Sequence, residues 1–361
     1  MTHLDIAHVR LHNHHIAGTK LAAPDAVVRW LGAVQSQDYA GAKWAVGQRM
    51  HDTTDAALDQ AFADGAILRT HVMRPTWHFV APADIRWLLA LTAPRVNATN
   101  AYHYRKHGLD DATFARSNAA LTNALRGGAQ RTRPELASVL QQAGIATNDL
   151  RLGLIMMRAE LDGVVCSGAR RGKQFTYALL DERAPPAETL ARDEALAELT
   201  RRYMTSHGPA TVQDFVWWSG LTMTDAKAGL EMVKPQLLHE VVGDRTYWFT
   251  APAPIERNPS PTAFLLPYFD EYTVGYTDRS AVLDAPPAEK VDSWNSFLLN
   301  PVMIVDGRVV GTWRRTLKKD AAIIEALPFA PLGAAAVQAL EVAAARYGQF
   351  IGVPVTLRLG R

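Results

Sequence analysis

Two glutamines stand one residue apart in the stretch LGAVQSQDYAGAKWAVG, which spans residues 31–47. Residues two apart point to nearly opposite sides of a helix, whereas on extended backbone they face the same way. We therefore expect the helix that begins near Pro24 to end at about Val34, so that the amides of Gln35 and Gln37 project into a shared space. The alternative is a pair of surface amides at a fraying helix end, because glutamine is mostly an exposed residue.

A glutamine amide is neutral and offers one carbonyl acceptor and two N–H donors. Two amides that face the same way can hold one water molecule from two sides, with each carbonyl accepting from the water while each NH2 donates elsewhere. The pair is therefore suited to placing a water molecule against a reacting atom. Asp38 follows directly and could strengthen that water as a base. On a strand it should point away from Gln37, so we expect a structural or capping role for it.

Composition limits the class of protein. The chain has 361 residues, of which 48% are hydrophobic and 20% charged, so it can bury a large core and should form about two to four domains. Its single cysteine, Cys166, excludes an internal disulfide framework and a thiolate cluster for zinc, which fits a reducing cytoplasm. No stretch is apolar for long enough to cross a membrane, and the N-terminus lacks the pattern of a secretory signal. Because the net charge is only +2, any nucleic-acid surface must be a local patch.

One order of elements, helix, turn, helix and hairpin, is expected three times, and it is the order of a winged helix. The middle occurrence comprises helices at 133–143 and 149–162 and a hairpin over VVCSGARRGKQFTYALL. The later one comprises helices within 194–209, 211–221 and 222–237 and two short strands around Gly243-Asp244. The first comprises helices at 24–34, 40–49 and 54–64 and two β-prone runs that Arg74-Pro75-Thr76 separates.

The sequence thus predicts a mainly helical α+β fold with β-hairpin wings, made of three tandem winged-helix units and a C-terminal α+β domain. We place the units at 1–82, 128–185 and 186–253, connecting helices at 83–127 and the C-terminal domain at 262–361. The proline-rich segment 251–261 is the clearest boundary. Beyond it we expect strands within 263–276 and 301–317 with a turn at Asp306-Gly307, a helix at 333–351 and a strand at 353–359.

Basic residues gather at two of the expected turns. A winged helix binds DNA by setting a helix in a groove and laying its hairpin against the backbone or the minor groove. Candidate DNA contacts are Lys43, then Arg170, Arg171 and Lys173 in GARRGKQ, then Trp313, Arg314, Arg315, Lys318 and Lys319 in GTWRRTLKK. The alternative is that basic turns are solvated hairpin tips. Several patches on tandem winged-helix units favour DNA.

The runs VQSQDYAGAKWAVGQR, LRTHVMRPTWHFVAPADIRWLLALTAPRV and LLPYFDEYTVGYTDR resemble the winged-helix DNA-binding proteins that include the AlkZ-like DNA glycosylases. The resemblance covers nearly the whole chain. It implies a monofunctional glycosylase that removes bulky N7-alkylated purines from double-stranded DNA and can unhook interstrand crosslinks. A Gln-x-Gln motif serves as the catalytic element in such enzymes, and here it falls on Gln35, Ser36 and Gln37. Ser36 departs mildly from the small apolar residue usual there, and the YcaQ relatives place Asp where Gln37 stands.

The residue chemistry agrees with that implication. An N7-alkylated guanine already carries positive charge, so it is a good leaving group without a strong general acid. What remains is to place water against an anomeric carbon with oxocarbenium character.

We expect a monomer, because the sequence shows no heptads, and a cytoplasmic, nucleoid-associated enzyme that uses no metal or nucleotide. The alternative is a non-enzymatic winged-helix DNA-binding protein or regulator. A weaker third possibility is a scaffold that binds a partner through its C-terminal domain.

The run RTHVMRPTWHFV supplies supporting candidates. His71 and His78 are not spaced as a metal pair, and we expect each to be a buried, satisfied histidine. Met73, Arg74 and Trp77 could contact the lesion or the gap that it leaves, and equally could be core and turn residues.

The resemblance also points to the carboxylates of FDEY, Asp270 and Glu271. Such a pair can be catalytic, but we expect these two to tie the C-terminal domain to the winged helices.

Overall fold

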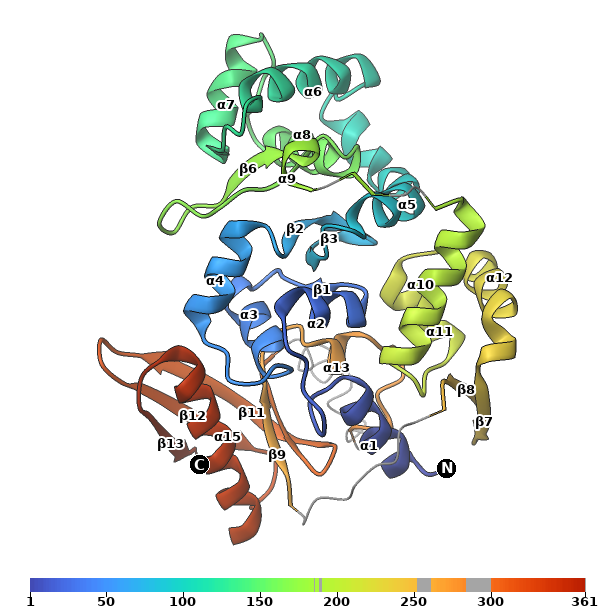
Figure 1. Ribbon diagram of the computed structural model, residues 1–361, viewed down its shortest axis with the longest axis vertical. Coiled ribbons are helices and arrows are strands. Elements are labelled where there is room, and N and C mark those ends of the chain that lie inside the picture. Colours follow the sequence, from blue (N-terminus) through green and yellow to red (C-terminus); the bar gives the residue numbers. More distant parts are fainter. Residues whose placement is uncertain (185, 188–189, 252–260, 284–299, 361) are drawn as a thin grey trace.

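A computed structural model of the protein describes residues 1–184, 186–187, 190–251, 261–283 and 300–360. It is a mixed helix and strand structure in which one order of elements occurs three times before a C-terminal sheet (Figure 1). The repeated order is helix, strand, helix, helix, strand, strand, and the first strand pairs with the last each time. We call the three occurrences unit 1, unit 2 and unit 3.

Unit 1 contains the glutamine pair. Its elements are α2 (Pro24–Leu31), β1 (Val34–Gln35), α3 (Tyr39–Gly47), α4 (Asp55–Asp64), β2 (Leu68–Val72) and β3 (Arg74–Val80), with sheet order β1-β3-β2. Helix α2 ends at Leu31 rather than Val34, because Gly32 at its C-cap adopts a φ of 81°, which favours glycine. The hairpin turns at Met73, with a φ of 63°, so Arg74 and Pro75 belong to β3 instead of separating two strands.

Unit 2 begins earlier in the chain than expected. Its elements are α6 (Asp111–Leu125), β4 (Arg131–Thr132), α7 (Arg133–Gln142), α8 (Arg151–Leu161), β5 (Val165–Ser167) and β6 (Thr176–Leu179), with sheet order β4-β6-β5. Helix α6 buries Phe114, Leu121 and Leu125 in the same core as α7 and α8, so it occupies the first-helix position of the unit. The connector is therefore the long helix α5 (Ile85–Lys106).

Unit 3 repeats the order with a reduced sheet. After the short α9 (Leu180–Arg183) come α10 (Arg192–Ser206), α11 (Val212–Ser219), α12 (Met223–Val233), the 3-10 turn η1 (Lys234–Gln236), β7 (Leu238–Val242) and β8 (Arg245–Phe249). A single antiparallel bridge between Ala210 and Trp248 stands where units 1 and 2 have a strand. Thr211 begins α11 with a capping box to Asp214, which satisfies free N–H groups at that end.

The C-terminal part is a five-stranded sheet with one long helix. Its elements are β9 (Ala263–Leu266), α13 (Glu271–Val274), β10 (Val302–Val305), β11 (Arg308–Leu317), β12 (Ala322–Pro328), α15 (Ala334–Ile351) and β13 (Val355–Leu359), with sheet order β13-β12-β11-β10-β9. Two expectations for this part were wrong. The FDEY run leads into the helix α13 and is not a strand, and the sequence did not predict strand β12. The turn at Asp306-Gly307 is confirmed, with φ values of 46° and 82°.

Unit 1 lies at the centre of the molecule, with unit 2 above it, unit 3 on one side and the C-terminal sheet on the other (Figure 1). Unit 1 and the C-terminal part share a hydrophobic core, in which Trp44 lies 5.1 Å from the ring centroids of both Tyr347 and Phe350. The indole of Trp44 also donates to the carbonyl of Leu265 at 2.7 Å. Residues 252–260 of the expected boundary lie outside the described residues. None of the described helices is long and apolar enough to cross a membrane.

Candidate active site

The glutamine motif lies where β1 joins α3. Gln35 is on extended backbone, with its Cα opposite that of His78 on β3, and Gln37 lies in the bend that leads to α3. Gln35 is buried and Gln37 is exposed. The helix therefore ends before the motif, as expected, and Gln35 is on a strand, but Gln37 lies past that strand in a bend and not on the extended backbone that we expected. The register continues past Gln35, since the amide N–H of Ser36 donates to the carbonyl of Trp77 at 2.7 Å.

Strand β3 holds both amides by their carbonyl oxygens. Arg74 donates from Nη2 to Oε1 of Gln35 at 3.0 Å, and the backbone N–H of Trp77 donates to Oε1 of Gln37 at 3.2 Å. We expected each carbonyl to be free for water, whereas the structure gives each one a protein donor. A carbonyl oxygen has two lone pairs, so each can still accept one further hydrogen bond. Neither amide NH2 donates to another described residue.

Arg74 connects the motif to unit 3. Its Nη1 donates to the backbone carbonyl of Trp217 at 3.2 Å, and its guanidinium lies 6.0 Å from the centroid of the Trp217 ring. Burial lowers the pKa of Arg74 from its ordinary value. The indole of Trp217 is exposed, and its N–H is fixed by a 2.8 Å hydrogen bond to the carbonyl of Val274.

Trp77, whose backbone N–H donates to Gln37, is fixed by contacts with Arg69 and His71. Its half-buried ring lies 4.4 Å from the guanidinium of Arg69 and 4.4 Å from the ring of His71. Arg69 donates to the carbonyl of Ser36 at 3.2 Å, and burial lowers the pKa of Arg69 to about 10. His71 is buried and its Nδ1 contacts the carboxylate of Glu160. Trp77 therefore combines a backbone donor for Gln37 with a ring held by packing.

His78 is buried beside the motif as expected, but it is not the fully satisfied histidine that the sequence predicts. Its Nδ1 lies 3.0 Å from the carbonyl of Thr76, so Nδ1 carries the proton, and its Nε2 is buried without a partner among the described residues. Burial, helped by the charge of Arg74, lowers the pKa of His78 to about 3. Within the described residues, no three of His, Cys, Asp and Glu gather as a possible metal site.

Asp270 and Glu271 are fully buried and join the C-terminal part to units 1 and 3. Asp270 accepts from both terminal nitrogens of Arg49, at 2.9 and 2.7 Å. Glu271 accepts from the amide N–H of Gln35 at 2.8 Å and from the indole of Trp218 at 2.9 Å. The contacts confirm that this carboxylate pair ties the C-terminal part to the repeated units, and they place Glu271 one hydrogen bond from the motif.

The structure contradicts three assignments made from the sequence. Asp38 occupies the N-cap position of α3, but its side chain accepts no hydrogen bond from the helix. Lys43 is 3% exposed and bonded to Asp55 at 2.7 Å and to Asp59 at 2.8 Å, so its charge is neutralised inside unit 1. Trp313 is also 3% exposed, and its indole donates to the carbonyl of Leu266. Lys43 and Trp313 therefore do not offer a surface to DNA.

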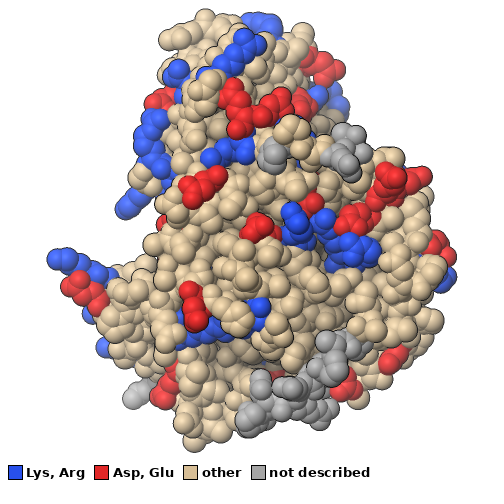
Figure 2. Space-filling view, viewed as in Figure 1, with Lys and Arg blue, Asp and Glu red and all other residues tan. Residues whose placement is uncertain are grey.

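The basic turn of unit 2, residues 168–175, lies against unit 1 near the motif. The guanidinium of Arg170 lies 4.8 Å from the ring centroid of Tyr39, two residues after Gln37. Arg171 is exposed and paired with Glu135 at 2.8 Å, and Lys173 is exposed. Figure 2 shows Lys and Arg side chains along the edge where Figure 1 places this turn, and again at the projecting tip of the C-terminal sheet.

The basic residues of the C-terminal tip are partly paired. Arg314 is bonded to Glu325 at 2.6 Å, and Arg315 contacts the hydroxyl of Tyr347. Lys318 and Lys319 are exposed at the turn between β11 and β12. The outline of the molecule is indented between this tip and the unit 2 turn (Figure 2).

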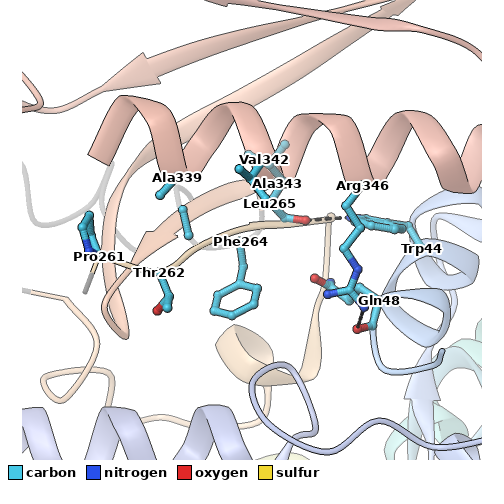
Figure 3. Close-up of a pocket in the computed structure, with 11 residues that line it drawn as sticks. Trp44, Gln48, Pro261, Thr262, Phe264, Leu265, Ala339, Val342, Ala343 and Arg346 are labelled. Atoms are coloured by element: carbon cyan, nitrogen blue, oxygen red, sulfur yellow. Dashed lines mark hydrogen bonds between the residues drawn. The ribbon is translucent and has the colours of Figure 1, made fainter. Parts of the chain in front are cut away.

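A cavity of about 320 Å³ lies elsewhere, between β9 and α15 (Figure 3). Its lining is mostly apolar, with Gln48 and Arg346 at one end, and none of its lining residues belongs to the glutamine motif.

Sequence reasoning missed the residues that fix the motif from outside unit 1, which are Trp217, Trp218, His207 and Glu160. The adjacent Trp217 and Trp218 on α11 were the available signal. Neighbours in a helix point in different directions, so one of two consecutive tryptophans must face away from the core.

A model of the family described as DNA glycosylase AlkZ-like matches residues 28–350. An interstrand DNA cross-link repair glycosylase of Streptomyces sahachiroi is 26% identical over 355 residues, which cover 93% of this chain and 92% of the relative. The solved structure of Streptomyces sahachiroi DNA glycosylase AlkZ shares the fold, with a TM-score of 0.81, 22% identity and full coverage of both chains. The class that these matches define is DNA glycosylase, a hydrolase of N-glycosyl bonds. The chain belongs to the AlkZ-like DNA glycosylase family.

Proposed function

We propose that this glycosylase hydrolyses the N-glycosidic bond of N7-alkylated purines in double-stranded DNA, including purines joined in interstrand crosslinks, and that it acts as a monomer. The similar Streptomyces sahachiroi protein is named for crosslink repair, which supports the crosslink part of the proposal. The three repeated units are winged helices in this proposal. Their support is the common order of elements and the pairing of the first strand with the last in each unit.

The observation that carries the proposal is the way β3 holds Gln35 and Gln37. Their Oε1 atoms accept from Arg74 and from the N–H of Trp77, donors three residues apart on one strand. Rigid donors fix the direction in which each amide presents its remaining lone pair and its NH2. A water held between two such amides is oriented without being deprotonated.

That arrangement suits the electronics of an N7-alkylpurine. The base leaves as a neutral molecule, so the enzyme needs little acid catalysis, and the sugar develops oxocarbenium character that water can capture. The buried neutral His78 is consistent with a reaction in which no histidine protonates the base. Arg74 remains charged, and its hydrogen bonds in the described chain go to neutral oxygens, so it can attract a phosphate beside the lesion.

In this proposal, basic side chains at two turns bind the phosphates of the duplex. Lys173 on unit 2 and Lys318 and Lys319 at the C-terminal tip are exposed, whereas Arg171 and Arg314 must exchange a carboxylate partner for a phosphate. Exposed ion pairs are weak, so that exchange costs little. The DNA-facing set is therefore Arg170, Arg171, Lys173, Arg314, Arg315, Lys318 and Lys319.

The test is release of free base from four duplexes: unmodified DNA, DNA with 7-methylguanine, DNA with a bulky N7 adduct, and DNA crosslinked through N7 atoms. The proposal expects release from the alkylated duplexes and none from unmodified DNA. A protein that binds all four duplexes and releases no base would instead be a non-enzymatic DNA-binding protein.

A further inference from the structure

We infer that Glu271 is a positioning residue for the reaction, because it fixes the backbone of Gln35 and thereby makes the catalytic motif depend on the C-terminal part and on unit 3. This inference rests on the proposed function of the glutamine pair. Oε1 of Glu271 accepts the Gln35 N–H at 2.8 Å, and Oε2 accepts the Trp218 indole N–H at 2.9 Å. Nε2 of His207 lies 3.6 Å from Oε2.

Glu271 does not touch the reacting atoms. Its side chain is about 1% exposed, and both carboxylate oxygens already accept from protein donors. Its burial and its two protein donors assign it to orienting the motif rather than to activating water. A buried carboxylate is stable only when donors satisfy its oxygens, and the N–H of Gln35 is one of them. Gln35 and Glu271 thus constrain each other.

The carboxylate is itself held in place. Burial alone would raise the pKa of Glu271, but the nearby imidazole of His207 and the Gln35 amide N–H bring it below its ordinary value. The preceding residue, Asp270, is fixed by Arg49 through two hydrogen bonds, and the N–H of Tyr272 donates to Asp270 at 3.0 Å. The start of α13 is therefore a rigid support behind β1.

The position of Gln35 matters because it is the last residue of β1. Beyond Gln35 the chain bends towards α3. Strand β1 pairs with β3 along one edge, and its other edge faces Glu271. On that edge the Gln35 N–H is satisfied by the carboxylate. Loss of the acceptor would leave a buried donor unpaired and would let the motif shift relative to Arg74 and Trp77. A small displacement of a water-positioning group is sufficient to slow a hydrolysis strongly.

Three variants test the inference against a matched control. Glu271→Ala removes both acceptors, and Glu271→Met removes both acceptors while it keeps a side chain of similar length. Trp218→Phe removes the donor to Oε2 and part of a buried ring, but keeps the Gln35 contact. The control is Tyr203→Phe, which deletes a buried hydrogen bond to the carbonyl of Gly275 at 2.8 Å in the same region without touching Gln35 or Glu271.

Two measurements are made on each folded variant. The first is the single-turnover rate constant for base release from a 7-methylguanine duplex at saturating enzyme, with the Kd for the same duplex. We expect Glu271→Met to lower the rate constant about tenfold or more while the Kd changes less than about twofold, and Tyr203→Phe to keep the wild-type rate. The rate constant of Trp218→Phe should lie between those of Glu271→Met and Tyr203→Phe, because the contact between Gln35 and Glu271 remains.

The second measurement is hydrogen exchange of the Gln35 amide in the free protein, which needs no activity. We expect faster exchange in Glu271→Met than in wild type, and no change in Tyr203→Phe. A wild-type rate in Glu271→Met, or an equal loss in Tyr203→Phe, would overturn the inference. If Glu271→Ala fails to fold, Glu271→Met and Trp218→Phe still decide it. If the wild type releases no base, the proposed function fails, whereas the exchange result still reports on the contact.

Discussion

Gln35 and Glu271 are 236 residues apart in the chain, and the amide N–H of Gln35 donates to Oε1 of Glu271 at 2.8 Å. The contacts of strand β1 are therefore completed by a residue from the C-terminal part of the protein. Because Glu271 also accepts from Trp218 in unit 3, one carboxylate joins three parts of the fold behind the glutamine motif. Unit 1 carries the motif, but it does not supply all the contacts that hold it.

Replacement of Arg74 by Lys should slow base release. An ammonium group cannot reproduce the fork by which the guanidinium donates to Gln35 at 3.0 Å and to the carbonyl of Trp217 at 3.2 Å. We expect the single-turnover rate constant to fall about tenfold, which corresponds to about 1.4 kcal/mol of transition-state stabilisation. The control is Arg192→Lys, which alters an exposed arginine paired with Asp225, outside the DNA-facing set, and should keep the wild-type rate. Equal rates in both variants would show that Gln35 does not need Arg74.

The Asp270–Arg49 pair should contribute to stability rather than to chemistry. Both side chains are at most 1% exposed, so Asp270→Asn leaves a buried guanidinium without its countercharge. We expect a loss of about 3–5 kcal/mol in the free energy of unfolding, measured by denaturant titration. Glu325→Gln, which breaks an exposed pair with Arg314, should cost less than about 1 kcal/mol. A small loss in Asp270→Asn would mean that the buried pair is replaced by other contacts.

His78 should make folding stability depend on pH in the acid range. Its pKa is about 3 in the folded protein, below the ordinary value of 6.5, so between these values the unfolded chain binds a proton that the folded one does not. Stability should therefore fall as the pH drops from 6.5 towards 3, by up to about 5 kcal/mol from this residue. The measurement is unfolding free energy against pH for wild type and His78→Gln. The variant should show a flatter curve, and parallel curves would contradict the assignment.

Lys173 should contribute to DNA affinity without affecting lesion recognition. It is exposed at the tip of the unit 2 turn, where a phosphate contact carries no sequence or lesion information. In Lys173→Ala we expect weaker binding of alkylated and unmodified duplexes by the same factor, with the slope of log Kd against log salt reduced by about one. An effect limited to alkylated DNA would place Lys173 at the lesion instead.

Local signals in the sequence were sufficient for most of the elements. Asp306-Gly307 and Gly243-Asp244 predict turns because their backbone conformations favour those residues, and the structure has hairpins at both places. The Gln-x-Gln spacing predicts extended backbone at Gln35, and the structure has a strand there. Such predictions depend only on residues close together in the chain.

Contacts between distant parts could not be predicted in the same way. The sequence around Lys43 is typical of a lysine on a helix surface. Lys43 is nevertheless buried, because Asp55 and Asp59 on the next helix neutralise its charge. Trp313 lies among basic residues on β11, yet strand alternation turns it inward, towards Tyr347. The contact between Glu271 and Gln35 depends on the packing of α13 behind β1, for which neither local sequence carries a signal.

The central claim is that Gln35 and Gln37 place the attacking water, and the direct measurement is single-turnover release of base by Gln35→Ala, Gln37→Ala and the double variant. The substrate is a duplex with a bulky N7-alkylguanine, and the Kd for that duplex is measured alongside. Each single variant should lose at least about tenfold in rate and the double variant should release no base above the spontaneous rate, while the Kd of each stays close to wild type. Release at the wild-type rate by the double variant would contradict the account and place the water on other residues.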